Sequence, residues 1–161
     1  MSNHSTQLMA EPGQLDFFIT RVFAAEHQKV FAAFSQPDLL QRWFMPKQAS
    51  LNIHYMTCQT GGAFHMSHQG PQGAQFGFRG VYHEVLPHHK IIKTSEFEGL
   101  PQKLEPVLEI TTFESISAKQ TKVTIHTLCP SAAYRDAMIQ ANMEPILQMT
   151  HGQLDELLAG G

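Results

Sequence analysis

The 161-residue chain is 42% hydrophobic, and its 11 Lys and Arg residues nearly balance its 14 Asp and Glu residues. This length suits one domain whose core needs no metal or disulfide, and the hydrophobic content is too high for a disordered chain. Neither sign of charge forms a run, so the sequence does not favour a nucleic acid as partner. No segment approaches the roughly 20 apolar residues of a membrane span.

The first residues, MSNHSTQLMAEPGQ, lack the basic and apolar regions of a secretory signal. We therefore expect a cytoplasmic protein with a flexible polar tail over residues 1–14 and a single domain over residues 15–161. Cys58 and Cys129 are too few for a disulfide framework in a domain of this size. Two reduced cysteines are the favoured interpretation, and a single bridge is the alternative.

The elements predicted first are a strand and two short helices. Residues 15–23 predict the strand, because their β-branched and aromatic side chains partly alternate. The first helix has one apolar face through Val30, Phe31 and Phe34. The second begins at Pro37, whose missing N–H costs nothing in the first turn of a helix.

The middle of the chain predicts a sheet and its end predicts a helix. Residues 49–128 contain about six strand segments joined by short turns, which is typical of an antiparallel meander. Ser131 is a good N-cap for the C-terminal helix. Pro145 predicts a break in that helix near Asn142 and Met143, since proline kinks a helix interior.

This order of elements predicts an α+β fold. A curved antiparallel sheet of about six to seven strands wraps around a long C-terminal helix, because the apolar face of such a sheet has to be covered. A single sheet rarely closes completely on one helix. The gap between them is where we expect a cavity.

Several segments resemble the SRPBCC superfamily, and within it the group of activators of heat-shock-protein-90 ATPase homologues. They are RVFAAEHQKVFAAFSQPDLLQRWFMP, TGGAF, GVYHEVLPHHKII and QLDELLA. The residues that match the signature of the group are Pro37, Leu40, Trp43, Gly61, Gly62, Gly80, Tyr82, Glu84, Val85 and Pro87. The resemblance covers nearly everything from Leu15 to Ala159 and implies a helix-grip fold, also called START-like or birch-pollen-allergen-like. Thr57 and Gln59 depart from it, because the group often has an acidic residue and an arginine there.

The segment HYMTCQTGGAFHMSH, residues 54–68, combines histidines with a cysteine around a Gly-Gly turn. Strand parity places Tyr55, Thr57, Phe64, Met66 and His68 on the inner face and His54, Met56, Cys58 and His65 on the outer face. The segment has no CxxC or HExxH spacing, so the sequence predicts no metal site and favours surface histidines near a structural cysteine.

Catalytic residues are not evident. A cysteine nucleophile needs a base and an orienting group, and neither Cys58 nor Cys129 has a recognisable set. Glu109 alternates with Val107. It is a candidate general acid or base if this face lines the cavity, and a solvated carboxylate otherwise. His126 is not assigned to either face, and no cofactor is expected.

Aromatic and methionine side chains, with a few polar groups, are the predicted lining of the cavity. This set contains Trp43, Tyr55, Phe64, Met66, His68, Phe76, Phe78, Tyr82, Phe97, Glu109, Met138 and Met143. The alternative is that these side chains simply pack on one another. Methionine adapts to ligands of irregular shape.

The leading functional hypothesis is a binding protein for a hydrophobic or amphipathic small molecule, lipid-like or aromatic. The second is an enzyme similar to the cyclases and aromatases of the superfamily, which would require polar side chains inside the cavity. The third is a protein-interaction role. The resemblance points to co-chaperones that carry a further large N-terminal domain, for which we see no room in this chain. A homodimer through exposed sheet edges is a further expectation.

Overall fold

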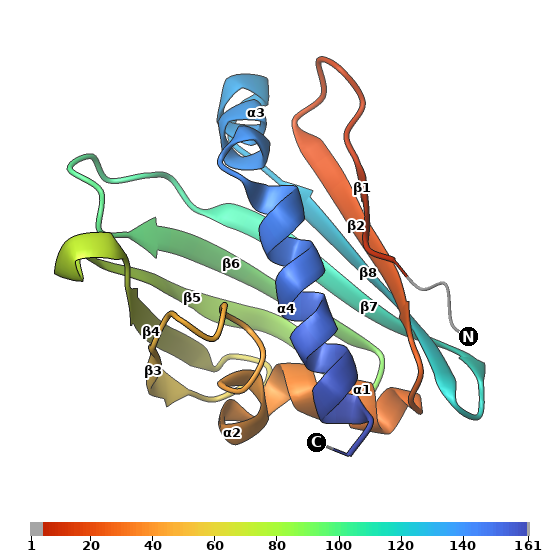
Figure 1. The fold of residues 1–161 in the computed structure, drawn as a ribbon. Coiled ribbons are helices and arrows are strands. Elements are labelled where there is room, and N and C mark those ends of the chain that lie inside the picture. The colour runs from red at the N-terminus through yellow and green to blue at the C-terminus, as the bar shows by residue number, and fades with distance from the viewer. Residues whose placement is uncertain (1–4, 161) are drawn as a thin grey trace.

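The computed structural model describes residues 5–160 as one curved antiparallel sheet packed around helices (Figure 1). The strands are β1 (Gln7–Met9), β2 (Asp16–Phe23), β3 (Leu51–Met56), β4 (Ala63–Gln69), β5 (Gln75–Leu86), β6 (Lys90–Glu98), β7 (Val107–Ser117) and β8 (Gln120–Leu128). The helices are α1 (His27–Ser35), α2 (Pro37–Leu40), α3 (Ala132–Gln140) and α4 (Met143–Leu158), with a one-turn 3-10 helix η1 (Pro71–Gly73).

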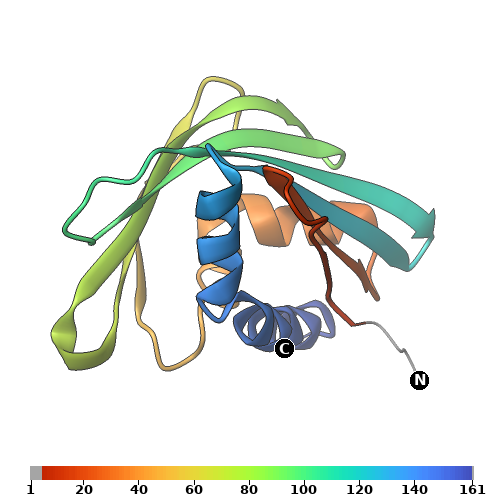
Figure 2. The same ribbon diagram turned by 90° about the horizontal axis from the view of Figure 1, so that it is seen from above.

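The sheet has the strand order β1-β2-β8-β7-β6-β5-β4-β3, and every neighbouring pair is antiparallel. Figure 2 shows the sheet arching over α4, with α1 across one end of the concave face. This arrangement confirms the predicted helix-grip architecture. The strand β2 pairs with β8, although α1, α2 and five strands lie between them in the chain.

The sheet has one strand more than the sequence predicts. Gln7 pairs with Thr20 and Met9 pairs with Phe18, so β1 extends the sheet beyond β2. The side chain of Thr6 is 5% exposed. The prediction of a flexible tail over residues 1–14 is therefore wrong for residues 6–9, and residues 1–4 lie outside the described part of the chain. The strand β1 has only three residues, and a segment this short is too short to show the alternation of apolar and polar side chains that identifies a strand.

The C-terminal helix is broken where the sequence predicts it. Asn142 has a φ of 64° and separates α3 from α4. Pro145 falls in the first turn of α4, where its missing N–H has no helical partner to lose. The Oγ atom of Ser131 accepts a hydrogen bond from the backbone N–H of Tyr134 at 3.0 Å, which confirms the predicted N-cap of α3.

The core joins the C-terminal part of α4 to α1 and to the segment after α2. Leu154 is fully buried, and Trp43 is 3% exposed. The indole N–H of Trp43 donates to the carbonyl of Ala33 at 2.8 Å. The side-chain amide of Gln153 donates to the carbonyls of Trp43 and Met45, at 3.1 and 2.8 Å. These bonds fix the C-terminal half of α4 relative to the segment after α2, and that segment relative to α1.

We predict that the left-handed residue between α3 and α4 tolerates Gly but not Ala. Asn142→Ala should lower the free energy of unfolding by about 1 kcal/mol, because a Cβ without a local hydrogen-bonding group is disfavoured at positive φ. Asn142→Gly is the matched control and should leave stability equal or slightly higher. Urea unfolding measures both, and an Ala variant as stable as the wild type would contradict the left-handed conformation.

Candidate functional site: a cavity under the sheet

A cavity of about 290 Å³ lies between the concave face of the sheet and the helices. Its roof is formed by side chains of the sheet that lie two residues apart on each strand and therefore share the concave face. On β6, Ile91, Lys93 and Ser95 all line the cavity, and on β7 Val107 and Glu109 do so. The floor comes from the two C-terminal helices and from the segment after α2. Nine of the predicted residues line this cavity, namely Trp43, Phe64, Met66, Phe78, Tyr82, Phe97, Glu109, Met138 and Met143.

Tyr55 does not face the cavity, because β3 contains a bulge. The register of β3 on β4 shifts between Ile53 and Tyr55, so strict alternation stops at His54. Tyr55 is 49% exposed, whereas Met56 lines the cavity. The predicted inner position of Tyr55, and of Thr57 after it, is therefore wrong. Met56 occupies the inner position instead.

His68 and Phe76 lie beside the cavity but do not line it. The rings of His68 and Phe76 have centroids 5.9 Å apart, and Phe76 stacks on Phe97 at 5.8 Å. Burial lowers the pKa of His68 from its ordinary value. Its Nδ1 atom is buried and has no hydrogen-bond partner among the described residues. His68 thus contributes a neutral ring that packs on neighbouring aromatics.

A row of four polar side chains crosses the roof of the cavity. Tyr82 on β5 pairs with Lys93 on β6, which pairs with Glu109 on β7, which pairs with Thr127 on β8. All four line the cavity. Lys93 Nζ lies 3.6 Å from Glu109 Oε1 and 5.0 Å from the centroid of the Phe64 ring. Of the two positions considered for Glu109 from the sequence, a cavity wall or the solvated outer face, the structure shows the cavity wall.

The sequence analysis missed Lys93 as a lining residue. Lysine usually lies in solvent, so its residue type does not indicate a cavity position. Parity with Ile91 and Phe97 on the same strand would have identified it, since residues two apart share a face. In the structure the side chain of Lys93 is 22% exposed.

Neither cysteine has the properties of a nucleophile. The Cys58 thiol packs against the main core, so its predicted outward position is wrong. Burial raises the pKa of this thiol, and it also raises the pKa of Tyr82. Cys129 donates to the sulfur of Met138 at 3.6 Å, and burial raises the pKa of its thiol too. Both cysteines are free thiols.

The histidines of the outer face have partners of their own. His54 hydrogen-bonds with Ser67 at 2.9 Å, and His65 hydrogen-bonds with Glu98 at 2.8 Å. Within residues 5–160, no group of three or more His, Cys, Asp or Glu side chains is arranged to hold a metal ion.

His126 also lies away from the cavity. Its ring stacks on Phe18, with centroids 4.1 Å apart, and its Nε2 atom lies 2.7 Å from a carboxylate oxygen of Asp16. The hydrogen bond with His126 lowers the pKa of Asp16. This pair therefore fastens the outer surface of β2 to β8.

One histidine lies at the wall of the cavity, on α4. His151 is 3% exposed, and its Nδ1 atom hydrogen-bonds with the hydroxyl of Thr6 at 2.7 Å. The same hydroxyl accepts from Arg21 at 3.1 Å, and Arg21 also forms an ion pair with Asp155. Burial, with the positive charge of Arg21 second, lowers the pKa of His151 to about 4. His151 therefore stays neutral near pH 7.

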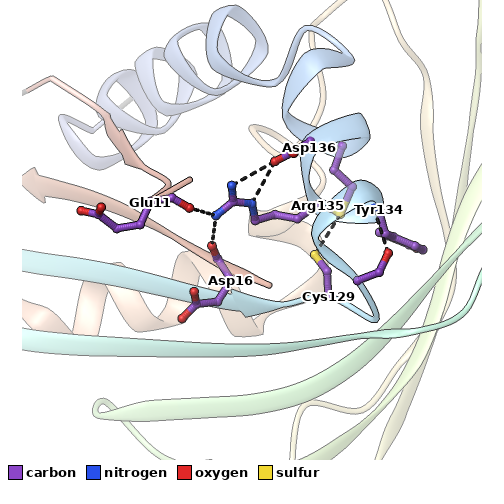
Figure 3. A network of polar contacts seen from close by, with 8 residues as sticks. Glu11, Asp16, Cys129, Tyr134, Arg135 and Asp136 are labelled. Atoms are coloured by element: carbon purple, nitrogen blue, oxygen red, sulfur yellow. Dashed lines mark hydrogen bonds and ion pairs between the residues drawn. The ribbon is translucent and has the colours of Figure 1, made fainter. Parts of the chain in front are cut away.

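A buried arginine positions α3, which supplies Tyr134 and Met138 to the lining (Figure 3). Arg135 is 3% exposed, and its Nη1 atom donates to the backbone carbonyls of Glu11 and Asp16 at 2.7 and 2.8 Å. The hydroxyl of Tyr134 donates to the carbonyl of Glu105 at 2.9 Å. These bonds hold α3 between the segment before β2 and the segment before β7.

Comparison with known proteins gives the family. The family model described as Activator of Hsp90 ATPase homolog 1-like protein matches residues 24–159. The chain belongs to this family. The match spans α1 to α4, so it includes all the strands of the sheet except β1 and β2. A search among curated proteins returns no match.

Solved structures with the same fold come from several bacteria. A Rhodobacter sphaeroides protein is 21% identical, with a TM-score of 0.83 over 96% of this chain and 99% of that one. A Mycobacterium smegmatis protein is 19% identical, with a TM-score of 0.85 over 96% of each chain. A Staphylococcus epidermidis protein is 25% identical, with a TM-score of 0.80 over 93% of each chain. None of the helices in the described residues is long and apolar enough to cross a membrane.

We predict that His151 makes the protein less stable in acid. The unfolded chain binds a proton at the ordinary histidine pKa, whereas the folded chain binds it only near a pKa of about 4. Stability should therefore fall as the pH decreases from about 6.5 to about 4, by about 2 to 3 kcal/mol. His151→Gln, which keeps a hydrogen-bonding group for Thr6, should lose less stability over the same range.

The measurement is urea unfolding of both proteins at pH 7.5 and pH 4.5. The other titrating groups are shared by the two proteins, so the difference between their pH dependences isolates His151. Equal losses in the two proteins would show that His151 does not carry the effect.

Proposed function

We propose that this protein binds a small apolar or amphipathic molecule in the cavity between the sheet and α4. The observation that carries the proposal is the composition of the lining. Aromatic and methionine side chains surround a volume of about 290 Å³, and one row of polar groups crosses it. Ligand pockets typically combine an apolar lining with a few convergent polar groups, and this volume is near their lower limit.

The driving force in this proposal is desolvation of the ligand. Each Å² of apolar surface removed from water contributes about 25 cal/mol, so an aromatic ligand gains several kcal/mol from rings such as Phe64, Phe78 and Phe97. Methionines such as Met66 and Met138 adapt their shape at low cost. The family is associated with ligand binding and with polyketide-cyclase-like roles, which supports this class of function.

The second candidate function is an enzyme of the cyclase type. The observation that favours it is the inward orientation of Glu109, the condition that such chemistry requires. In the structure this carboxylate forms an ion pair with Lys93. A carboxylate held by a cation is better suited to orient a ligand than to remove a proton from one, so binding remains the first proposal.

Filling the cavity should weaken binding. Ser95 lines the cavity and Glu96, the next residue on β6, does not. Ser95→Phe adds a ring to the cavity, whereas Glu96→Phe adds the same ring to the other face of the strand. We expect Ser95→Phe to weaken binding of the neutral fluorescent probe N-phenyl-1-naphthylamine by about tenfold or more, and Glu96→Phe to leave it within about twofold.

Fluorescence titration of the wild type and both variants measures this effect, and urea unfolding checks that all three are folded. Native mass spectrometry of the purified protein should in addition detect a co-purified apolar molecule. The proposal is wrong if the wild type does not bind the probe, or if both variants bind it as the wild type does.

A further inference from the structure

The charged pair in the roof of the cavity is incompletely satisfied. Among the described residues, the Lys93 ammonium contacts a carboxylate oxygen of Glu109 at 3.6 Å, which is beyond the length of a good hydrogen bond. Its other contact is the face of the Phe64 ring. An ammonium group has three donors, and a carboxylate accepts several hydrogen bonds. The pair therefore has unused donors and acceptors at the wall of an apolar cavity.

The spacing of the pair suits a single oxygen atom that bridges it. An oxygen about 2.8 Å from each group fits over two atoms that are 3.6 Å apart. Such an oxygen would accept from Lys93, and it would have to donate its own proton to Glu109. A hydroxyl group does both, whereas an ether or carbonyl oxygen only accepts.

The other members of the row provide further hydroxyl groups on either side. Tyr82 precedes Lys93 in the row, and Thr127 follows Glu109. Burial raises the pKa of Tyr82, so its hydroxyl keeps its proton near pH 7. On β6 and β7, the inward-facing pairs on either side of Lys93 and Glu109 are uncharged. They are Ile91 with Thr111, and Ser95 with Val107. Charge is thus confined to one point of the roof.

The charge balance of the pair discriminates between head groups. Lys93 and Glu109 together carry no net charge, so a neutral hydroxyl adds none to the cavity. A carboxylate would bring an unpaired negative charge beside Glu109, and burying an unpaired charge is costly. A neutral hydroxyl is the group that satisfies both partners at the lowest desolvation cost.

We infer that Lys93 and Glu109 form a subsite for one neutral hydroxyl group on an otherwise apolar ligand, with Lys93 donating to the hydroxyl oxygen and Glu109 accepting its proton. This inference rests on the proposed binding function and makes it more specific. It assigns the cavity to apolar alcohols and phenols rather than to fatty or aromatic acids.

Three ligands of nearly equal shape test the inference: naphthalene, 2-naphthol and 2-naphthoate. Each competes with N-phenyl-1-naphthylamine for the cavity, and its dissociation constant follows from the loss of probe fluorescence at pH 7. We expect 2-naphthol to bind about tenfold more tightly than naphthalene, which corresponds to about 1.4 kcal/mol. Because 2-naphthol is the more soluble in water, an apolar cavity without the subsite would give the opposite order. The weakest of the three should be 2-naphthoate.

Two sets of variants connect the preference to the pair. The double variant Lys93→Met with Glu109→Leu replaces both charges by apolar groups, so it does not strand one unpaired charge in the roof. In it the preference for 2-naphthol should fall to about twofold or less, while naphthalene still binds. The matched control is Lys90→Met. The ammonium group of Lys90 on β6 forms an ion pair with the carboxylate of Glu84 on β5 at 2.9 Å, and neither residue lines the cavity. The preference for 2-naphthol should therefore persist in this variant.

The outcomes separate the subsite from the proposed function. If none of the ligands displaces the probe and the probe itself does not bind, the binding function fails. If naphthalene binds but 2-naphthol binds no better, or if the preference survives in the double variant, the subsite is wrong while the binding function stands. Tighter binding of 2-naphthoate than of 2-naphthol would also overturn the inference, because it would assign an anion to Lys93.

Discussion

The constraint on which this structure depends is a mismatch of widths between the sheet and the helix that covers it. Eight strands about 4.8 Å apart span about 34 Å, whereas α4 is about 10 Å wide and its 16 residues are about 24 Å long. One helix therefore cannot cover the apolar face of a flat sheet of this size. The sheet curves around the helix, assisted by register shifts in its pairings, and α1 covers one end of the concave face.

The mismatch divides α4 into two functional halves. Its C-terminal half belongs to the core, where Leu154 is fully buried and Gln153 satisfies two carbonyls of the segment after α2. In its N-terminal half, Met143, Leu147 and Thr150 line the cavity together with residues of α3. The same helix thus belongs to the core at one end and forms part of the floor of the cavity at the other.

The sequence predicted the features that depend on local chemistry. Proline and cap residues identified the break between α3 and α4, and the order of the elements predicted the fold. Of the twelve residues predicted to line the cavity from the aromatic and methionine content, nine do so. It failed where geometry is not local. A bulge near His54 reverses the faces of Tyr55 and Met56, and neither residue type signals a bulge. The strand β1 is held by tertiary contacts such as the hydrogen bond between His151 and Thr6, the residue before the strand. The sequence of a three-residue segment carries no signal of such contacts.

The two walls of the cavity differ in how much they can adjust, and this difference bears on selectivity. The roof positions its polar groups by strand register, so Tyr82, Lys93 and Glu109 stand in a fixed order on hydrogen-bonded neighbours. The opposite wall includes flexible side chains such as Met138 and Met143, which repack around ligands of different outline. For the proposed binding function, we expect such a site to discriminate strongly between functional groups and weakly between shapes, because an unmatched polar group costs more free energy than a repacked methionine. The proposal therefore predicts selection by one head group among apolar molecules of varied shape.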